Sequence, residues 1–91
     1  MAYALLIAPA AQRDLRRLPR SLRERVDAVV RSLRENPRPA GAKRLDRTMH
    51  RVRVGDYRLI YAIRDASAEV VLARFGHRRE IYKELRRGGQ L

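Results

Sequence analysis

The sequence contains no cysteine and no tryptophan, and it has only two histidines, His50 and His77. A chain without thiols cannot form a disulfide, a thiolate zinc site or a cysteine nucleophile. Two histidines are also too few for an ordinary structural metal site. We therefore expect neither a metal ion nor a cofactor.

Long hydrophobic runs are also absent. No apolar stretch approaches the roughly 18 residues of a transmembrane helix. The stretch Tyr3–Ile7 is apolar, but it is short for a signal peptide and no charged leader precedes it. These features predict a cytoplasmic protein, and 91 residues predict one domain over residues 1–91 with a small core.

Acidic residues are few, which leaves the chain strongly basic. Ten Asp and Glu stand against 22 Lys and Arg, a net charge of +12 at pH 7, and lysine occurs only at positions 43 and 83. This charge excludes a cationic partner and favours nucleic acid, an anionic membrane surface or an acidic protein. Because a GC-rich genome also raises the arginine count, the positions of the arginines are more informative than their number.

Hydrophobic periodicity predicts one strand and two helices in the first part of the chain. Tyr3–Ala8 is apolar on both faces, which is typical of an inner strand or one covered on both sides. Residues 9–36 carry apolar side chains at helical spacing, with a break at Pro19. Ser21 and Glu24 fit a capping box at the start of the second helix. This segment is expected to form an antiparallel helical hairpin.

The second half of the chain alternates with a period of two. Tight turns separate three expected strands, at residues 50–54, 57–64 and 69–76. Arg38–Arg44 is basic, contains Pro and Gly, and is expected to be a loop. Residues 78–85 are expected to form a short helix, and 86–91 a frayed tail. The predicted fold class is α+β: an N-terminal strand, a helical hairpin and a three-stranded antiparallel meander with a short C-terminal helix.

One hairpin breaks a local rule of sheet stability. If Gly55–Asp56 is its two-residue turn, Arg53 lies directly opposite Arg58, and like charges at such a position destabilise a sheet. By parity, Arg51 and Arg64 share this face, while Arg74 and Arg78 share a parity further along. A cation cluster that opposes stability is typical of a working site, and phosphate oxygens are natural ligands of several guanidinium groups.

The alternative interpretation is an ordinary solvated sheet face, with nearby carboxylates neutralising some of the arginines. On the opposite parity, Tyr57, Tyr61 and Phe75 are expected in the core. His50 could serve either the core or a site, and the residues alone leave both open.

Two segments resemble the signature motifs of the RelE/ParE toxin superfamily. Arg51–Tyr61, with the sequence RVRVGDYRLIY, is similar to the arginine-rich hairpin of that family, and Gly76–Tyr82, with the sequence GHRREIY, is similar to its C-terminal motif. A helical hairpin that closes on Asn36–Pro37 also fits. The resemblance covers residues 3–85 and implies a RelE-like fold and the toxin component of a type II toxin–antitoxin system.

The resemblance implies two alternative activities. RelE-like toxins are endoribonucleases that cut mRNA in the ribosomal A site, inhibit translation and arrest growth. ParE-like toxins share the fold but inhibit DNA gyrase without nuclease activity. The implied partners are a cognate acidic antitoxin together with mRNA and the ribosome, or gyrase in the second case. On charge alone, a basic nucleic-acid-binding module without toxicity also remains open.

The resemblance also assigns roles to individual positions. The basic strand residues of the family fall on Arg51 and Arg53, its transition-state arginine on Arg58, its second catalytic arginine on Arg78 and its C-terminal aromatic residue on Tyr82. The RelE type often has lysine where this chain has arginine on the first strand. The basic loop adds two candidates for phosphate binding, Lys43 and Arg44.

Metal-independent RNA cleavage needs groups that stabilise negative charge and groups that transfer a proton. The 2′-OH attacks the adjacent phosphorus and leaves a 2′,3′-cyclic phosphate and a 5′-OH. Arginine stays protonated, so Arg58 and Arg78 are expected to stabilise the developing charge and Arg53 to position the phosphate. Proton transfer then falls to Tyr82 or His77. Tyr82 could instead stack on a base, and both roles remain open.

Overall fold

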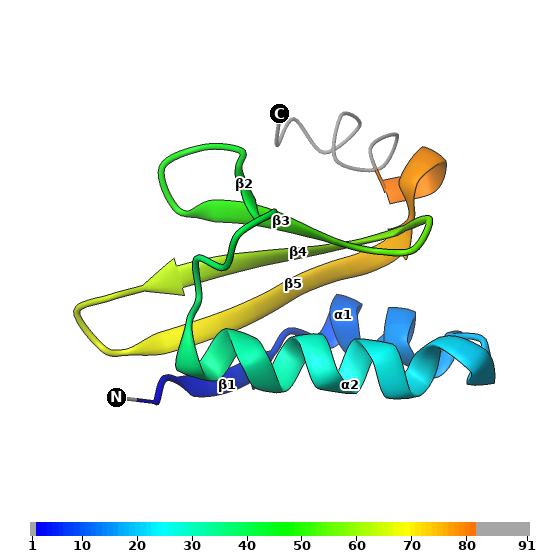
Figure 1. Cartoon of the computed structure of the whole chain (residues 1–91), viewed down its shortest axis with the longest axis horizontal. Coiled ribbons are helices and arrows are strands. Elements are labelled where there is room, and N and C mark those ends of the chain that lie inside the picture. The colour runs from blue at the N-terminus through cyan, green and yellow to red at the C-terminus, as the bar shows by residue number, and fades with distance from the viewer. Residues whose placement is uncertain (1, 82–91) are drawn as a thin grey trace.

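A mixed five-stranded sheet covered on one face by two helices forms the structure of residues 2–81, which a computed structural model describes (Figure 1). The strands are β1 (Ala4–Ile7), β2 (Lys43–Arg44), β3 (Met49–Val54), β4 (Tyr57–Arg64) and β5 (Glu69–His77), and the helices are α1 (Pro9–Arg16) and α2 (Arg20–Glu35). The order across the sheet is β1-β5-β4-β3-β2, with β1 parallel to β5 and the other neighbours antiparallel. The predicted α+β class is confirmed.

Strand β1 lies at the edge of the sheet, so the expectation of an inner or doubly covered strand was wrong. Among residues 2–81, its one neighbouring strand is β5, through the register Leu5↔Val70 and Leu6↔Val71. Helices α1 and α2 both cover the same face, to which Leu5 and Ile7 contribute. Leu6 points to the other face and is 42% exposed. Apolar residues on both faces of a short strand therefore did not indicate two covered faces here.

The start of α2 also differs from the expectation. Its N-cap is Pro19, without a side-chain capping hydrogen bond, and Ser21 lies inside the first turn. The carbonyl oxygen of Pro19 accepts a hydrogen bond from the Leu22 amide at 3.0 Å, which begins the helix before the predicted capping box. The proline that separates the two helices thus also begins the second one.

The predicted basic loop contains a short strand that carries no periodic signal. Strand β2 pairs with the edge of β3 through Lys43↔Arg51 and Arg44↔His50. Two charged residues show no alternation that a pattern could detect, and charged side chains are common on edge strands. The sheet therefore extends one strand beyond the predicted meander.

The main core lies between the sheet and the helices. Both contribute buried side chains, including Val26 and Leu33 from α2 and Leu59, Tyr61 and Leu72 from the sheet. The core positions predicted for Tyr61 and Phe75 are confirmed, and Tyr57 is half-buried with its ring 5.3 Å from that of Phe75. A smaller cluster on the opposite face joins Ile60 to Ile81, with Leu45, Met49 and Ala73 packed against them.

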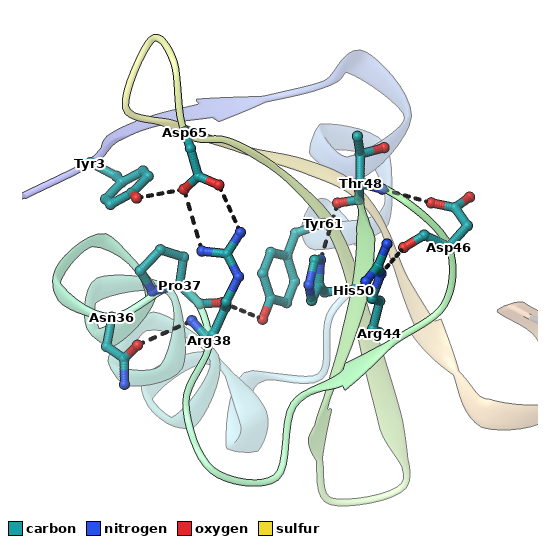
Figure 2. A network of polar contacts seen from close by, with 10 residues as sticks. All are labelled: Tyr3, Asn36, Pro37, Arg38, Arg44, Asp46, Thr48, His50, Tyr61 and Asp65. Carbon is teal, nitrogen blue, oxygen red and sulfur yellow. Dashed lines mark hydrogen bonds and ion pairs between the residues drawn. The ribbon is translucent and has the colours of Figure 1, made fainter.

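The loop after α2 is tied to the sheet by a polar network (Figure 2). The buried Tyr61 hydroxyl donates to the Pro37 carbonyl at 2.7 Å, and the His50 ring stacks on the Tyr61 ring at 5.7 Å. Arg38 pairs with Asp65 at 2.8 Å, and the Tyr3 hydroxyl donates to the same carboxylate. His50 is only 7% exposed, which places it in this structural network.

Two pKa shifts follow from this network. Burial raises the pKa of the Tyr61 hydroxyl to about 12, because the phenolate would lose its hydration. The pKa of Asp65 is lowered from its usual value, first by the hydrogen bond from Arg38 and then by that from Tyr3. The folded protein therefore favours a neutral Tyr61 and an ionised Asp65.

We expect Tyr61→Phe to lower the free energy of unfolding by about 1 kcal/mol, because the Pro37 carbonyl loses its donor. The tyrosine pKa is raised in the folded state, so its contribution is complete below the usual pKa of about 10 and is lost as pH rises toward 12. Urea unfolding and alkaline titration of phenol absorbance measure the two effects. Tyr57→Phe is the control, because the described residues show no hydrogen bond for that hydroxyl. Equal stability losses in both variants would contradict the assignment.

A candidate phosphate-binding site on the open face of the sheet

Helices α1 and α2 lie against one face of the sheet, and we call the other face the open face (Figure 1). The register of β2, β3 and β4 places four cations on the open face. Arg53 is the direct cross-strand partner of Arg58, and Lys43 is that of Arg51. Cross-strand partners project on the same side, and the alternate residues of β3 and β4 point into the core. These four residues, the cation row, therefore cross β2, β3 and β4 on one face. The predicted opposition of two arginines is confirmed.

Arg58 is the unusual member of the row. It is only 7% exposed, whereas Lys43 and Arg53 are exposed. Its Nη1 donates to the carbonyl of Tyr57 at 3.1 Å and, at a long 3.4 Å, to that of Gly55. Its buried Nε has no hydrogen-bond partner in the described part of the chain. A buried guanidinium is rarely left with a donor unused, and an anion is its natural acceptor.

Arg38, Arg64 and Arg74 form ion pairs with carboxylates within the described residues. Within residues 2–81, no ion pair links Lys43, Arg53 or Arg58 to an acidic side chain. Arg64 shares the open face but pairs with Glu69 at 3.7 Å at the other end of β4. Arg74 pairs with Asp14 of α1 at 2.9 Å. The expectation that Arg64 and Arg74 belong to the cluster was therefore wrong.

The chain returns to the row at the end of β5. Gly76 is the cross-strand partner of Arg58, and two residues later the Arg78 amide donates to the Asp56 carbonyl at 2.9 Å. Residues 78–81 begin a helix, in agreement with the prediction for 78–85 as far as the described residues reach. The backbone of Arg78 is thus fixed beside the turn that joins Arg53 to Arg58. Tyr82 and the predicted tail 86–91 lie outside the described residues.

Comparisons with known proteins identify the family. Residues 5–82 match the family described as "ParE toxin of type II toxin-antitoxin system, parDE". The chain belongs to the RelE/ParE toxin superfamily. The toxin RelG of Mycobacterium tuberculosis is 37% identical over 87 residues, which cover 91% of this chain and 99% of RelG.

Solved structures agree with this assignment. A chain of the toxin–antitoxin complex RelBE2 from Mycobacterium tuberculosis is 32% identical, with a TM-score of 0.74 over 86% of this toxin and 100% of that chain. The archaeal RelE–RelB complex from Pyrococcus horikoshii gives 25% identity and a TM-score of 0.78 over 86% and 97%. The isolated RelE toxin of E. coli gives 25% and 0.76 over 94% and 97%. The predicted RelE-like fold is confirmed.

Two predicted site residues of this toxin lie apart from the cation row. His77 is the cross-strand partner of Tyr57, on the helix-covered face, and its ring meets that of Tyr57 edge-on at 5.7 Å. Its Nδ1 accepts a hydrogen bond from the Arg79 amide at 3.3 Å. Arg44 is the partner of His50, and its Nε donates to the Asp46 carbonyl at 2.8 Å (Figure 2). The sheet register thus groups neither residue with Arg58.

The side chains of the row offer positive charge and hydrogen-bond donors but no acceptor. No three His, Asp or Glu side chains in the described range 2–81 lie close enough together to hold a metal ion. None of the helices within that range is long and apolar enough to cross a membrane. What the row can do chemically is bind an anion and stabilise negative charge.

We expect Arg53→Gln to raise the free energy of unfolding by several tenths of a kcal/mol, because it removes a like charge from directly opposite Arg58. The gain should shrink in high salt, which screens the repulsion at an exposed position. Urea unfolding at low and high ionic strength measures both. The control is Arg47→Gln, which removes one exposed cation from the loop between β2 and β3. A stability loss in Arg53→Gln would show that the pair is not repulsive.

Proposed function

We propose that this toxin is a metal-independent endoribonuclease that cleaves mRNA on the ribosome and so inhibits translation. The observation that carries the proposal is the Arg53–Arg58 pair on a carboxylate-poor stretch of the open face, with the buried Nε of Arg58 lacking an acceptor. A phosphate oxygen placed there satisfies the donor and offsets the repulsion. The similarity to RelG and to RelE toxins supports the same activity.

In the proposed reaction the 2′-oxygen of one ribose attacks the adjacent phosphorus. The bond from phosphorus to the 5′-oxygen breaks, which leaves a 2′,3′-cyclic phosphate and a 5′-OH. Arg58 and Arg78 stabilise the negative charge that grows on the phosphoryl oxygens, and removal of one such donor commonly slows a reaction about 10²–10³-fold. Arg51, Arg53 and Lys43 hold the flanking phosphates.

Proton transfer needs a group other than arginine. Tyr82 is the first choice, because it follows Arg78 by four residues in the sequence and a phenol can transfer a proton. His77 is only the second choice, because it lies on the helix-covered face of the sheet and Arg58 lies on the other face. A site without a strong dedicated base depends on precise placement of its substrate, which the ribosome supplies by holding the message. The net charge of +12 promotes association with ribosomal RNA.

The proposed inhibitor is a cognate acidic antitoxin. Several similar structures are RelB–RelE complexes, in which a toxin is bound to its antitoxin. An acidic segment that covers the cation row would occupy the same donors as the phosphates of the message. Such a segment can be disordered until it binds, because the toxin surface supplies the order.

A second candidate function is inhibition of DNA gyrase without catalysis. The observation that favours it is the family description, which names the ParE toxin. This alternative predicts intact mRNA, a halt in replication and a DNA-damage response.

Induced expression followed by mapping of mRNA 5′ ends over a few minutes tests the proposal. We expect cleavage in phase with codons, and we expect Arg58→Ala to slow cleavage about 10²–10³-fold because the oxyanion loses a preorganised donor. The matched control is Arg64→Ala, on the same face and strand but paired with Glu69. It should retain cleavage and toxicity.

The product chemistry adds an independent check. The upstream fragment should carry a 2′,3′-cyclic phosphate, and purified toxin should cleave mRNA on programmed ribosomes when the only divalent cation is the Mg²⁺ that the ribosome itself requires. An unchanged transcriptome with stalled replication would overturn the nuclease proposal in favour of gyrase. Equal loss of cleavage in Arg58→Ala and Arg64→Ala would show that the site is placed wrongly.

A further inference from the structure

Strand β5 contains one residue more than its partner β4. Ile60 pairs with Arg74, but the next residue, Tyr61, pairs with Leu72, so Ala73 has no partner of its own. This is a β-bulge, a feature that shifts which side of the sheet the following side chains take.

The bulge changes the parity of everything that follows it. Before it, the even-numbered Val70 and Leu72 are buried under the helices. After it, the odd-numbered Phe75 takes the helix-covered side, and Gly76 falls opposite Arg58. Arg78 is the first residue of the helix that follows β5, and Ile81 of that helix packs against Ile60 on the open face. Without the extra residue, Gly76 would lose its place opposite Arg58, and the chain that leads to Arg78 would be one residue out of register.

A carboxylate from α1 holds the bulge in place. Oδ2 of Asp14 accepts from the Phe75 amide at 2.8 Å and from Arg74 Nε at 2.9 Å, and Oδ1 accepts from Arg74 Nη2 at 3.2 Å. These are the two residues directly after Ala73. The side chain of Asp14 is only 12% exposed, so these bonds are shielded from water.

Asp14 lies where the sheet itself offers no acceptor for the Phe75 amide. Strand β1 pairs with residues 69–72 of β5 and ends at Ile7, before the bulge. The Phe75 amide lies beyond that pairing, and a buried amide without an acceptor is costly. Asp14 replaces the missing strand partner at this point only.

We propose that Asp14 is a positioning residue for RNA cleavage: it fixes the bulge at Ala73 and thereby keeps Arg78 on the open face beside Arg53 and Arg58. The expected effect on activity rests on the proposed function, whereas the role of Asp14 in fixing the bulge does not. Phosphate binding and the chemical step then depend on different features of the open face, because the cation row binds phosphate without help from the bulge. Loss of Asp14 should therefore impair the chemical step more than binding.

The test compares Asp14→Ala and Asp14→Asn with the control Asp27→Asn, which changes an exposed aspartate in α2. In isotope-labelled toxin, Asp14→Ala should lose hydrogen-exchange protection at the Phe75 amide and the cross-strand NOE between Arg58 and Gly76. Asp14→Asn should keep more of both, since its amide oxygen still accepts from Phe75. The control should match the wild type, and far-UV circular dichroism verifies that each variant is folded.

Single-turnover cleavage of programmed ribosomes gives the second readout. We expect Asp14→Ala to cleave about 10²-fold more slowly at saturation, the scale of a misplaced catalytic group, with ribosome affinity changed less than twofold. The cleavage rate of Asp14→Asn should fall between those of the wild type and Asp14→Ala. A Phe75 amide that stays protected in Asp14→Ala, or a rate loss matched by lost affinity or by the unfolded fraction, overturns the inference. If the wild type does not cleave, the proposed function fails, and the exchange and NOE data alone decide whether Asp14 holds the bulge.

Discussion

The repulsion between Arg53 and Arg58 is the constraint around which this small protein is arranged. Two guanidinium groups lie directly opposite each other on neighbouring strands, and Arg58 is nearly buried. Like charges at such a position oppose pairing of the strands. The hairpin persists because its other side chains, among them Val54 and Leu59, are fully engaged in the core. The apolar side chains that stabilise the hairpin and the charged side chains thus lie on opposite sides of the same two strands.

The polar network at the other end of the sheet supports this division. Tyr61 holds the Pro37 carbonyl, and Asp65 joins Arg38 to Tyr3, so the loop after α2 is attached to the strands that carry the cations. Two of the acidic side chains, Asp14 and Asp65, form ion pairs with Arg74 and Arg38. A carboxylate within the cation row would relieve the repulsion but would also occupy the donors that a phosphate needs.

Much of the fold and part of the candidate site could be predicted from the sequence. The turn Gly55–Asp56 determines the register of its hairpin, so the opposition of Arg53 and Arg58 followed from two residues of turn chemistry. Strand β2 could not be predicted, because two charged residues show no period. The capping-box motif misplaced the start of α2, because Pro19 begins the first turn itself.

The bulge in β5 could not be predicted from the hydrophobic pattern. Ala73 ends the apolar run Val70–Ala73, where an inserted small residue leaves no mark on the hydrophobic pattern. Counting alternate residues through this run does not show that Val70 and Phe75 lie on the same side of the sheet. The register places Gly76, and not His77, opposite Arg58. The signal that could have revealed the bulge is Asp14, an acid on the inner side of a short helix, but its partner is fixed only by the tertiary structure.

An acidic antitoxin and an RNA phosphate would act on the same unsatisfied charges, and this has an energetic consequence. Any anion that binds the folded row and not the unfolded chain stabilises the toxin by mass action. Relief of the Arg53–Arg58 repulsion adds to that effect, because the unfolded chain does not hold the two cations together. The repulsion would therefore destabilise the toxin most when it is free and least when an antitoxin or an RNA phosphate is bound. The same repulsion that weakens the isolated hairpin would thus become part of the affinity for either proposed partner.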